Sequence, residues 1–200
     1  MLLFENSFEE NLLPFKGEVH YYPSFFDKSK SDKFLNQLKE EVLWRHEPIW
    51  MFGKKVMQPR LTALYGNPQI AYGYSGIEMK PLDWSPFLSE IKNRIEDVAD
   101  TEFTHVLLNY YRDGQDSMGW HRDNEKVLGN NPVIGSVSFG ISRDFQLRLY
   151  ADKSNKRTIL LEHGSLLLMK GETQHHWEHQ IPKSKTVRGP RVNLTFRKIF

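Results

Sequence analysis

His121 and Asp123 stand two positions apart, and their side chains could together bind a metal ion. They lie in the stretch SMGWHRDNE (117–125), directly after a turn that contains glycine. In an extended segment, side chains two residues apart point to the same face, so the imidazole and the carboxylate would converge. Two histidines and one carboxylate form a facial triad for iron(II) that leaves coordination positions open. An H-x-D pair alone is more often part of a polar surface loop than of a metal site.

A third ligand could come from the segment HHWEHQIP (175–182), which contains three histidines. A facial triad needs only one of them. The spacing alone leaves His175, His176 and His179 as alternatives.

The segment RVNLTFRKI (191–199) carries a second set of polar residues. As a strand it would place apolar side chains on one face, and two guanidinium groups, an amide and a hydroxyl on the other. Burying that polar face is costly without an anionic partner, and arginine binds carboxylates through two parallel hydrogen bonds. A dicarboxylate ligand is one interpretation, and a solvent-facing edge strand is the other. The residues of the polar face would be Arg191, Asn193, Thr195 and Arg197.

Asn109 and Tyr111 repeat this arrangement in LLNYY (107–111). They are also two residues apart, so in a strand they would share one face. The amide and the hydroxyl could then donate hydrogen bonds to the same ligand.

Two helices are predicted upstream of these residues. In SDKFLNQLKEEVLW (31–44), apolar residues recur at helical spacing behind a cap at Ser31 or Asp32. In DWSPFLSEIKNRIEDVAD (83–100), Ser85 can cap a helix with an apolar stripe.

From Phe103 onward the pattern changes to short strands between turn signals. Strands in series without intervening helices are typical of a sandwich, a barrel or a jelly roll. We therefore expect a mainly β domain with flanking helices, in which residues 1–100 pack as helices and loops on a β-core formed by residues 101–200. The predicted strands are 103–111, 132–140, 145–150, 158–162, 164–170, 175–181 and 191–199.

Composition limits the other possibilities. The chain of 200 residues suits one domain, and without cysteine it has no disulfide, thiolate zinc site or cysteine nucleophile. A net charge of +2 is too small to indicate nucleic-acid binding by itself. No apolar run is long enough to span a membrane, and acidic residues near the N-terminus argue against a signal peptide. We expect an intracellular protein, cytoplasmic in a bacterium and nuclear in a eukaryote.

Taken together, these segments resemble the AlkB family of iron(II)- and 2-oxoglutarate-dependent dioxygenases, especially the branch that contains the human nuclear nucleic-acid demethylases. The resemblance runs from about His20 to the C-terminus, with the motifs in family order. They are NYYRDGQDSMGWHRDNE, SVSFGISRDF, HGSLLLM, HHWEHQIP and PRVNLTFRKI.

The resemblance implies a double-stranded β-helix, which is a form of jelly roll. It implies that His121, Asp123 and His179 bind Fe(II), with His179 in the position that precedes the final strand. It also implies O2 and 2-oxoglutarate as co-substrates. The residues implied to bind 2-oxoglutarate are Asn109, Tyr111, Arg191, Asn193, Thr195 and Arg197.

The implied reaction is oxidative demethylation of N-alkylated bases such as 1-methyladenine and 3-methylcytosine. Such a base must leave its stack before it reaches the metal. MFGKK (51–55) resembles the hydrophobic finger of the family, and AYGYSG (71–76) resembles its nucleotide-recognition lid. Read locally, these aromatic residues would more often be core filler and hairpin packing. The residues implied to bind substrate are Phe52, Gly53, Lys54, Tyr72, Tyr74 and Glu125.

Two departures from the family pattern affect the substrate. Asn124 replaces the acidic residue expected beside Glu125, and the loop in YADKSNKRTILL (150–161) is shorter and less basic than the loop that grips the opposite strand of a duplex. We expect a monomer that acts on alkylated single- or double-stranded DNA, with RNA as a further possibility and no membrane partner. The alternatives are an RNA-modifying or protein-directed oxygenase and a non-catalytic nucleic-acid-binding jelly roll.

Overall fold

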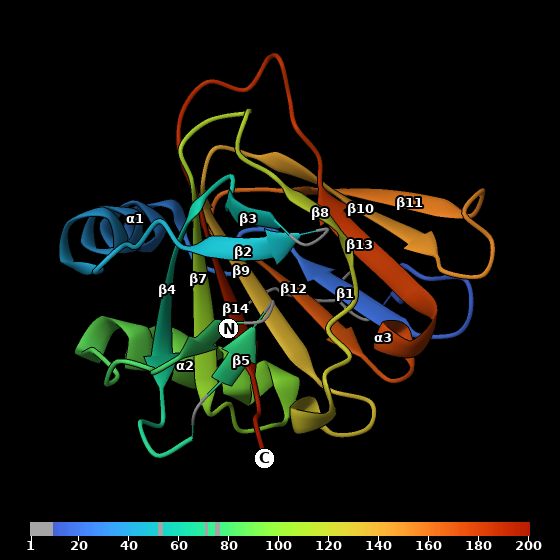
Figure 1. The fold of residues 1–200 in the computed structure, drawn as a ribbon, viewed down its shortest axis with the longest axis horizontal. Helices are drawn as coiled ribbons and strands as arrows, with labels where there is room; N and C mark the ends of the chain where they lie inside the picture. Colours follow the sequence, from blue (N-terminus) through green and yellow to red (C-terminus); the bar gives the residue numbers. More distant parts are fainter. Residues whose placement is uncertain (1–9, 52–53, 71, 75–76) are drawn as a thin grey trace, which may run out of the picture.

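Two antiparallel β-sheets form the centre of the molecule, and two helices cover the outer face of the larger sheet (Figure 1). This structure is a computed structural model and describes residues 10–51, 54–70, 72–74 and 77–200. Within these ranges, no helix is long and apolar enough to cross a membrane.

The larger sheet has six strands, with β14 between β9 and β7 near its centre. Every residue of β14 is buried, which excludes the interpretation of this segment as a solvent-facing edge strand. Its alternation is as predicted, because Val192, Leu194 and Phe196 pack in the core beneath the helices. In sheet order the strands are β1 (Glu18–Tyr22), β12 (Ser165–Lys170), β9 (Ile134–Gly140), β14 (Arg191–Arg197), β7 (His105–Tyr111) and β4 (Leu61–Gly66).

The smaller sheet has four strands, and its inner face packs against the larger sheet through a second apolar cluster. From β7 to β14 consecutive strands alternate between the two sheets, except that β10 and β11 form a hairpin within the smaller one. This path is that of a double-stranded β-helix, so the predicted jelly-roll fold is confirmed. In sheet order the strands are β11 (Lys156–Leu161), β10 (Arg143–Leu149), β13 (Trp177–Ile181) and β8 (Met118–His121).

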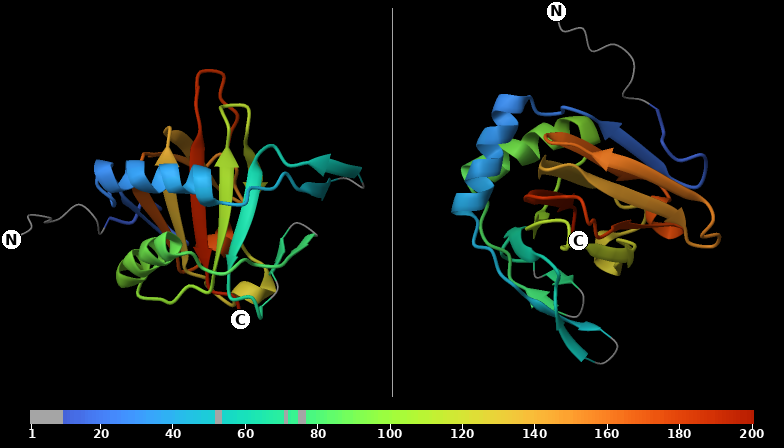
Figure 2. Two further views of the ribbon diagram at one scale, coloured as in Figure 1. Left: turned by 90° about the vertical axis from the view of Figure 1, so that its left-hand side faces the viewer. Right: turned by 90° about the horizontal axis from the view of Figure 1, so that it is seen from above.

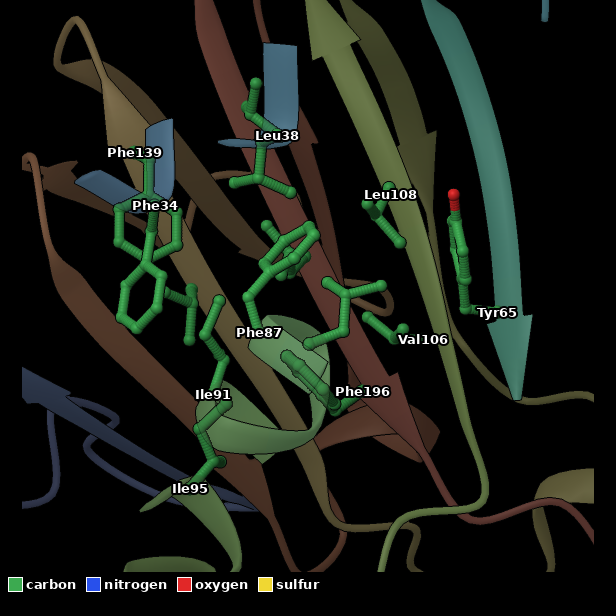
Figure 3. Close-up of a cluster of buried hydrophobic side chains, with 14 of the residues drawn as sticks. Phe34, Leu38, Tyr65, Phe87, Ile91, Ile95, Val106, Leu108, Phe139 and Phe196 are labelled. Carbon is green, nitrogen blue, oxygen red and sulfur yellow. The ribbon is translucent and has the colours of Figure 1, made fainter. Parts of the chain in front are cut away.

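The main core lies between the larger sheet and the helices α1 (Lys28–Glu41) and α2 (Pro86–Ala99) (Figure 3). Ile91 and Ile95 of α2 are fully buried there. Ser85 caps α2 as predicted, since its side chain accepts a hydrogen bond from a backbone amide in the first turn. Helix α2 therefore packs on the apolar face of the larger sheet, opposite to the face that carries the polar residues of β14.

Helix α1 begins earlier than predicted, and a cap at Ser31 or Asp32 is wrong. The side chain of Asp27 accepts a hydrogen bond from the amide of Lys30 at 2.8 Å and caps the helix. Ser31 is buried inside the first turns, where its hydroxyl donates to the carbonyl of Phe26 at 3.2 Å. Capping depends on backbone conformation as well as residue type, and Asp27 has the extended backbone that a cap requires.

Two further segments differ from the expected secondary structure. Residues 1–100 contribute more than helices and loops, because β1 and β4 form the two edges of the larger sheet. His175 and His176 belong to the short helix α3 (Thr173–His176) rather than to the strand predicted over 175–181. Strands that pair with residues far along the chain leave little local signal, since tertiary contacts decide such pairings.

Two small hairpins project from one side of the molecule (Figure 2). The first pairs β2 (Pro48–Met51) with β3 (Lys54–Met57), and the second pairs β5 (Tyr72–Tyr74) with β6 (Ile77–Met79). Neither hairpin belongs to the jelly-roll sheets.

Candidate active site

His121, Asp123 and His179 lie together between the two sheets. Each offers a ligand atom, and these atoms all lie within 4.8 Å of one another. His121 of β8 is the direct register partner of His179 of β13, and their ring centroids are 4.2 Å apart. Three ligands that approach from one side could hold a metal ion and leave the remaining coordination positions open.

Asp123 joins this cluster although β8 ends at His121. Two side chains from distant parts of the chain hold Asp123 in place beyond the end of the strand. The backbone amide of Asp123 donates to Oε1 of Gln174 at 2.9 Å, and Nη2 of Arg197 donates to Oδ2 of Asp123 at 2.9 Å. Oδ1 makes no hydrogen bond to a described residue and lies 3.8 Å from Nε2 of His121. It remains available to a metal.

The two histidines are also fixed in orientation. Nδ1 of His121 is 2.8 Å from the carbonyl oxygen of Gly119, which can only accept, so Nδ1 carries the proton and Nε2 keeps its lone pair. The ring of His179 stacks on Phe145 with centroids 5.2 Å apart. Its Nδ1 is buried without a hydrogen-bond partner among the described residues.

Electrostatics keep all three groups in the protonation state that a metal requires. Burial lowers the pKa of His179 to about 3, and burial also lowers the pKa of His121. Burial alone would raise the pKa of Asp123, but Arg197 and the two histidines lower it to about 2. Neutral imidazoles and an ionised carboxylate are the forms that coordinate metals.

A pocket adjoins the cluster, and the polar face of β14 forms part of its wall. Strand β7 supplies the neighbouring wall, since Asn193 pairs with Asn109 and Arg191 pairs with Tyr111 in the sheet register. All six residues predicted to bind the co-substrate line this pocket together with the metal cluster: Asn109, Tyr111, Arg191, Asn193, Thr195 and Arg197.

Arg191 is the member of this set with the least satisfied side chain. It is 1% exposed, its Nη2 donates to Oγ of Ser138 at 2.9 Å, and its guanidinium carbon lies 5.2 Å from the ring centroid of Tyr111. Nε and Nη1 are buried without a hydrogen-bond partner among the described residues, and no described acidic residue forms an ion pair with Arg191. Burial lowers the pKa of Arg191 to about 10, so the guanidinium stays charged at neutral pH. A buried, unpaired cation favours an anionic ligand.

Asn193 and Thr195 are already engaged within the protein. The Asn193 amide donates to Oγ of Ser136 at 2.9 Å and to the carbonyl of Val137 at 3.0 Å, and the Thr195 hydroxyl donates to Oδ1 of Asn193 at 3.0 Å. These bonds stiffen the pocket wall.

Two residues near the site lack a signal in the sequence. Gln174 holds Asp123 across 51 positions, and Arg60 donates to Oδ1 of Asn109 at 2.7 Å across 49 positions. Each is almost fully buried. Only their burial reveals them, because a single glutamine or arginine in a polar segment resembles any surface residue.

The predicted substrate residues are placed less completely. Phe52 and Gly53 lie outside the described residues, and Lys54 is exposed at the start of β3. Tyr72 and Tyr74 lie on β5 in the second hairpin. The structure thus places Lys54 and these two tyrosines in the hairpins that project from one side (Figure 2).

Glu125 follows Asp123 and precedes a short 3₁₀ helix (Lys126–Leu128). Its Oε2 is buried without a hydrogen-bond partner among the described residues. Burial and the nearby Asp123 carboxylate raise the pKa of Glu125. His175 is exposed and His176 partly so, and neither belongs to the metal cluster.

Comparison with known proteins gives a consistent result. Residues 18–197 match the model of the 2OG-Fe(II) oxygenase superfamily. The mouse protein named alpha-ketoglutarate-dependent dioxygenase alkB homolog 3 is 41% identical over 196 residues, which cover 92% of this chain and 67% of that protein. The mouse DNA oxidative demethylase ALKBH2 is 40% identical over 189 residues, which cover 89% of this chain and 79% of that protein. The structure of OsALKBH1 aligns with a TM-score of 0.68 at 18% identity, covering 92% of this chain and 98% of that one.

Proposed function

Because this chain belongs to the AlkB family of the 2OG-Fe(II) oxygenase superfamily and is an iron(II)- and 2-oxoglutarate-dependent dioxygenase, we propose that it repairs alkylated DNA by oxidative demethylation. The substrates would be N-alkylated bases such as 1-methyladenine and 3-methylcytosine. The observation that carries this proposal is the cluster of His121, Asp123 and His179, which is half-buried at His121 and buried at the other two residues. It lies beside a pocket whose buried Arg191 has two nitrogens without a hydrogen-bond partner among the described residues.

The cluster suits iron(II) for two reasons: it combines two imidazoles with a carboxylate, and it contains buried polar atoms that lack a hydrogen-bond partner among the described residues. Oδ1 of Asp123 and Nδ1 of His179 are buried polar atoms without a hydrogen-bond partner among the described residues. Such atoms are costly to leave unpaired, so a ligand is expected to occupy at least one of them. His121, Asp123 and His179 would together hold iron(II) and leave open positions for the co-substrates.

The same pocket suits 2-oxoglutarate, which has a carboxylate at each end. Arg191 would bind the distal carboxylate through its two unpaired nitrogens. Arg197 lies at the metal end, because it already donates to Asp123. Asn109 and Tyr111 would donate further hydrogen bonds from the neighbouring strand.

Bound at this site, iron(II) with O2 and 2-oxoglutarate would supply the oxidation that hydroxylates the N-methyl carbon and converts 2-oxoglutarate into succinate and CO2. The hydroxymethyl base then releases formaldehyde and the normal base. The role of the chain is to position these groups in a largely buried pocket and to keep the histidines neutral.

Glu125 would favour the damaged base over the normal one. Bases methylated at these ring nitrogens are cationic at neutral pH, and a nearby carboxylate attracts them. Burial raises the pKa of Glu125, and a cationic base beside it would favour the ionised form again.

The two hairpins would contact the nucleic acid strand, with Phe52 as a wedge and with Tyr72 and Tyr74 stacking on the flipped base. Single- and double-stranded DNA are both possible substrates, and RNA is an alternative. We further propose that the protein acts as a monomer at an intracellular site, where alkylated nucleic acid is found.

The test is to load the protein anaerobically with iron(II) and 2-oxoglutarate, add methylated oligonucleotides, and then admit O2. Mass spectrometry should reveal the loss of one methylene mass (CH2) per lesion in single- or double-stranded DNA, with formaldehyde as the second product. An RNA arm of the same sequence decides between DNA and RNA. Turnover of 2-oxoglutarate with no change in any oligonucleotide would contradict the proposed substrate.

A further inference from the structure

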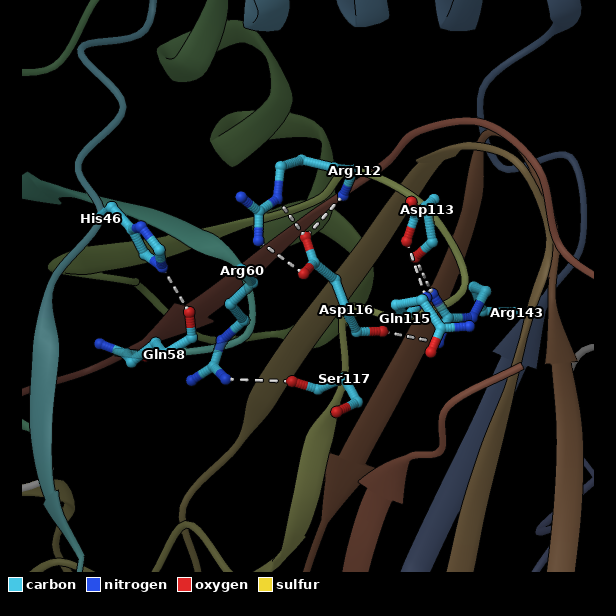
Figure 4. A network of polar contacts seen from close by, with 9 residues as sticks. All are labelled: His46, Gln58, Arg60, Arg112, Asp113, Gln115, Asp116, Ser117 and Arg143. Atoms are coloured by element: carbon cyan, nitrogen blue, oxygen red, sulfur yellow. Dashed lines mark hydrogen bonds and ion pairs between the residues drawn. The ribbon is translucent and has the colours of Figure 1, made fainter. Parts of the chain in front are cut away.

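Arg60 is a buried arginine behind the co-substrate pocket. It is 3% exposed and lies between the hairpin 48–57 and strand β4. Its Nε donates to Oδ1 of Asn109 at 2.7 Å. Figure 4 shows its second bond, in which Nη1 donates to the carbonyl of Ser117 at 3.2 Å. Asn109 lines the pocket, whereas Arg60 is not among the residues of its wall.

This contact determines which end of the Asn109 amide faces Arg60. An asparagine side chain has an oxygen that accepts and an NH2 group that donates, and the two are nearly equal in size. Arginine has only donors, so Arg60 can bind only the oxygen. The Nδ2 group of Asn109 makes no hydrogen bond to a described residue, so it remains available to donate.

The orientation matters because the expected ligand is an anion. A carboxylate near Asn109 needs a donor, and an amide turned the other way would direct its oxygen lone pairs at the carboxylate. We propose that Arg60 is a positioning residue, which holds the Asn109 amide with its NH2 group toward the 2-oxoglutarate pocket. This inference rests on the co-substrate site of the proposed function.

A purely structural role for Arg60 is the competing explanation. The segment before β4 is also tied to the strand that leads to the metal by a bond from the Ser117 amide to the carbonyl of Pro59 at 3.0 Å. If Arg60 served only this connection, its loss would loosen the metal strand β8 and the pocket together. The experiment therefore has to measure metal binding and co-substrate binding separately.

Calorimetry of the protein with manganese(II) in place of iron(II), without O2, gives both affinities without turnover. Arg60→Met should weaken 2-oxoglutarate binding about tenfold, equivalent to about 1.4 kcal/mol, and change manganese affinity by less than about twofold. Arg60→Lys keeps the charge, but an ammonium group lacks the planar geometry with which the guanidinium bonds Asn109 and Ser117 at once. It should therefore weaken 2-oxoglutarate binding by a few-fold. The control is Arg112→Met, because Arg112 bonds Asp116 of the adjoining loop (Figure 4) and should leave both affinities unchanged.

A double-mutant cycle tests whether Arg60 acts through Asn109. In an Asn109→Ala background, adding Arg60→Met should cause no further loss of 2-oxoglutarate affinity. An equal loss in both backgrounds, or a parallel fall in manganese affinity, would overturn the inference. If Arg60→Met binds 2-oxoglutarate as the wild type does, the inference about Arg60 is wrong, but the proposed co-substrate site stands. If the wild-type protein binds manganese but not 2-oxoglutarate, the proposed co-substrate site is wrong as well.

Discussion

Arg191 allows a prediction that separates binding from stability. Its guanidinium is 1% exposed, and Nε and Nη1 have no hydrogen-bond partner among the described residues. A structural arginine would have its hydrogen bonds satisfied within the protein. We therefore expect the ligand-free protein to tolerate the loss of Arg191, whereas 2-oxoglutarate binding requires it.

The magnitude for Arg191→Met follows from the contacts that are lost. Replacing buried charges by apolar groups of similar volume is often neutral or stabilising by about 1–4 kcal/mol, and the lost bond to Ser138 costs about 1 kcal/mol. The free energy of unfolding of the ligand-free variant should therefore change by between about −1 and +3 kcal/mol. Loss of two charge-assisted hydrogen bonds should weaken 2-oxoglutarate binding by about 100-fold or more. Arg191→Lys keeps the charge but not the fork geometry, so a loss of about tenfold is expected.

Two measurements check this prediction on the same samples. Urea denaturation of the ligand-free protein gives the free energy of unfolding, and calorimetry with manganese(II) and 2-oxoglutarate gives the affinity. For the wild type, added 2-oxoglutarate should also raise the urea midpoint, because it binds only the folded state. The reasoning is refuted if Arg191→Met destabilises the ligand-free protein by clearly more than about 1 kcal/mol, or if its folded fraction binds 2-oxoglutarate as tightly as the wild type does.

Three further predictions concern the metal cluster and the substrate. His179→Ala should abolish manganese binding and demethylation with an unchanged far-ultraviolet circular dichroism spectrum, whereas His175→Ala should retain both activities because His175 lies outside the cluster. Gln174→Leu removes the acceptor for the Asp123 amide and should lower metal affinity about tenfold or more in a chelator competition, and an unchanged affinity would show that Arg197 alone is sufficient. Phe52→Ala should reduce repair of duplex oligonucleotides more than that of single strands, measured by mass spectrometry, and equal losses would assign Phe52 to the core.

Much of the site could be predicted from the sequence because its residues are spaced by strand geometry. The alternation of β14 depends only on the two-residue repeat of a strand, so the shared face from Arg191 to Arg197 was predictable once a strand was assumed. Residue types alone predicted that one of three downstream histidines would join His121 and Asp123. The family resemblance was needed to select His179. The cap of α2 was equally local, since Ser85 is followed directly by Pro86.

Local reasoning failed at the start of α1 and at the two edges of the larger sheet. Ser31 is a good capping residue by type, but it lies inside α1 because the chain already has the extended conformation of a cap at Asp27. The strands β1 and β4 exist as edges of the larger sheet through pairing with β12 and β7, which are far away in the chain. Pairing of this kind depends on neighbours that a local window does not contain.

Residue types and their order along the chain were enough to predict the candidate metal ligands His121 and Asp123, the polar face of β14 and the jelly-roll succession of strands. The folded structure was needed to show how Asp123 is held in the candidate metal cluster and that Gln174 and Arg60 lie behind the site. It was also needed to show that Arg191 is buried with two nitrogens that have no hydrogen-bond partner among the described residues. The physical reason is that residue type and spacing record what a side chain can bind and which face it occupies. Burial and hydrogen bonds between residues about 50 positions apart arise only when distant segments of the chain fold against each other.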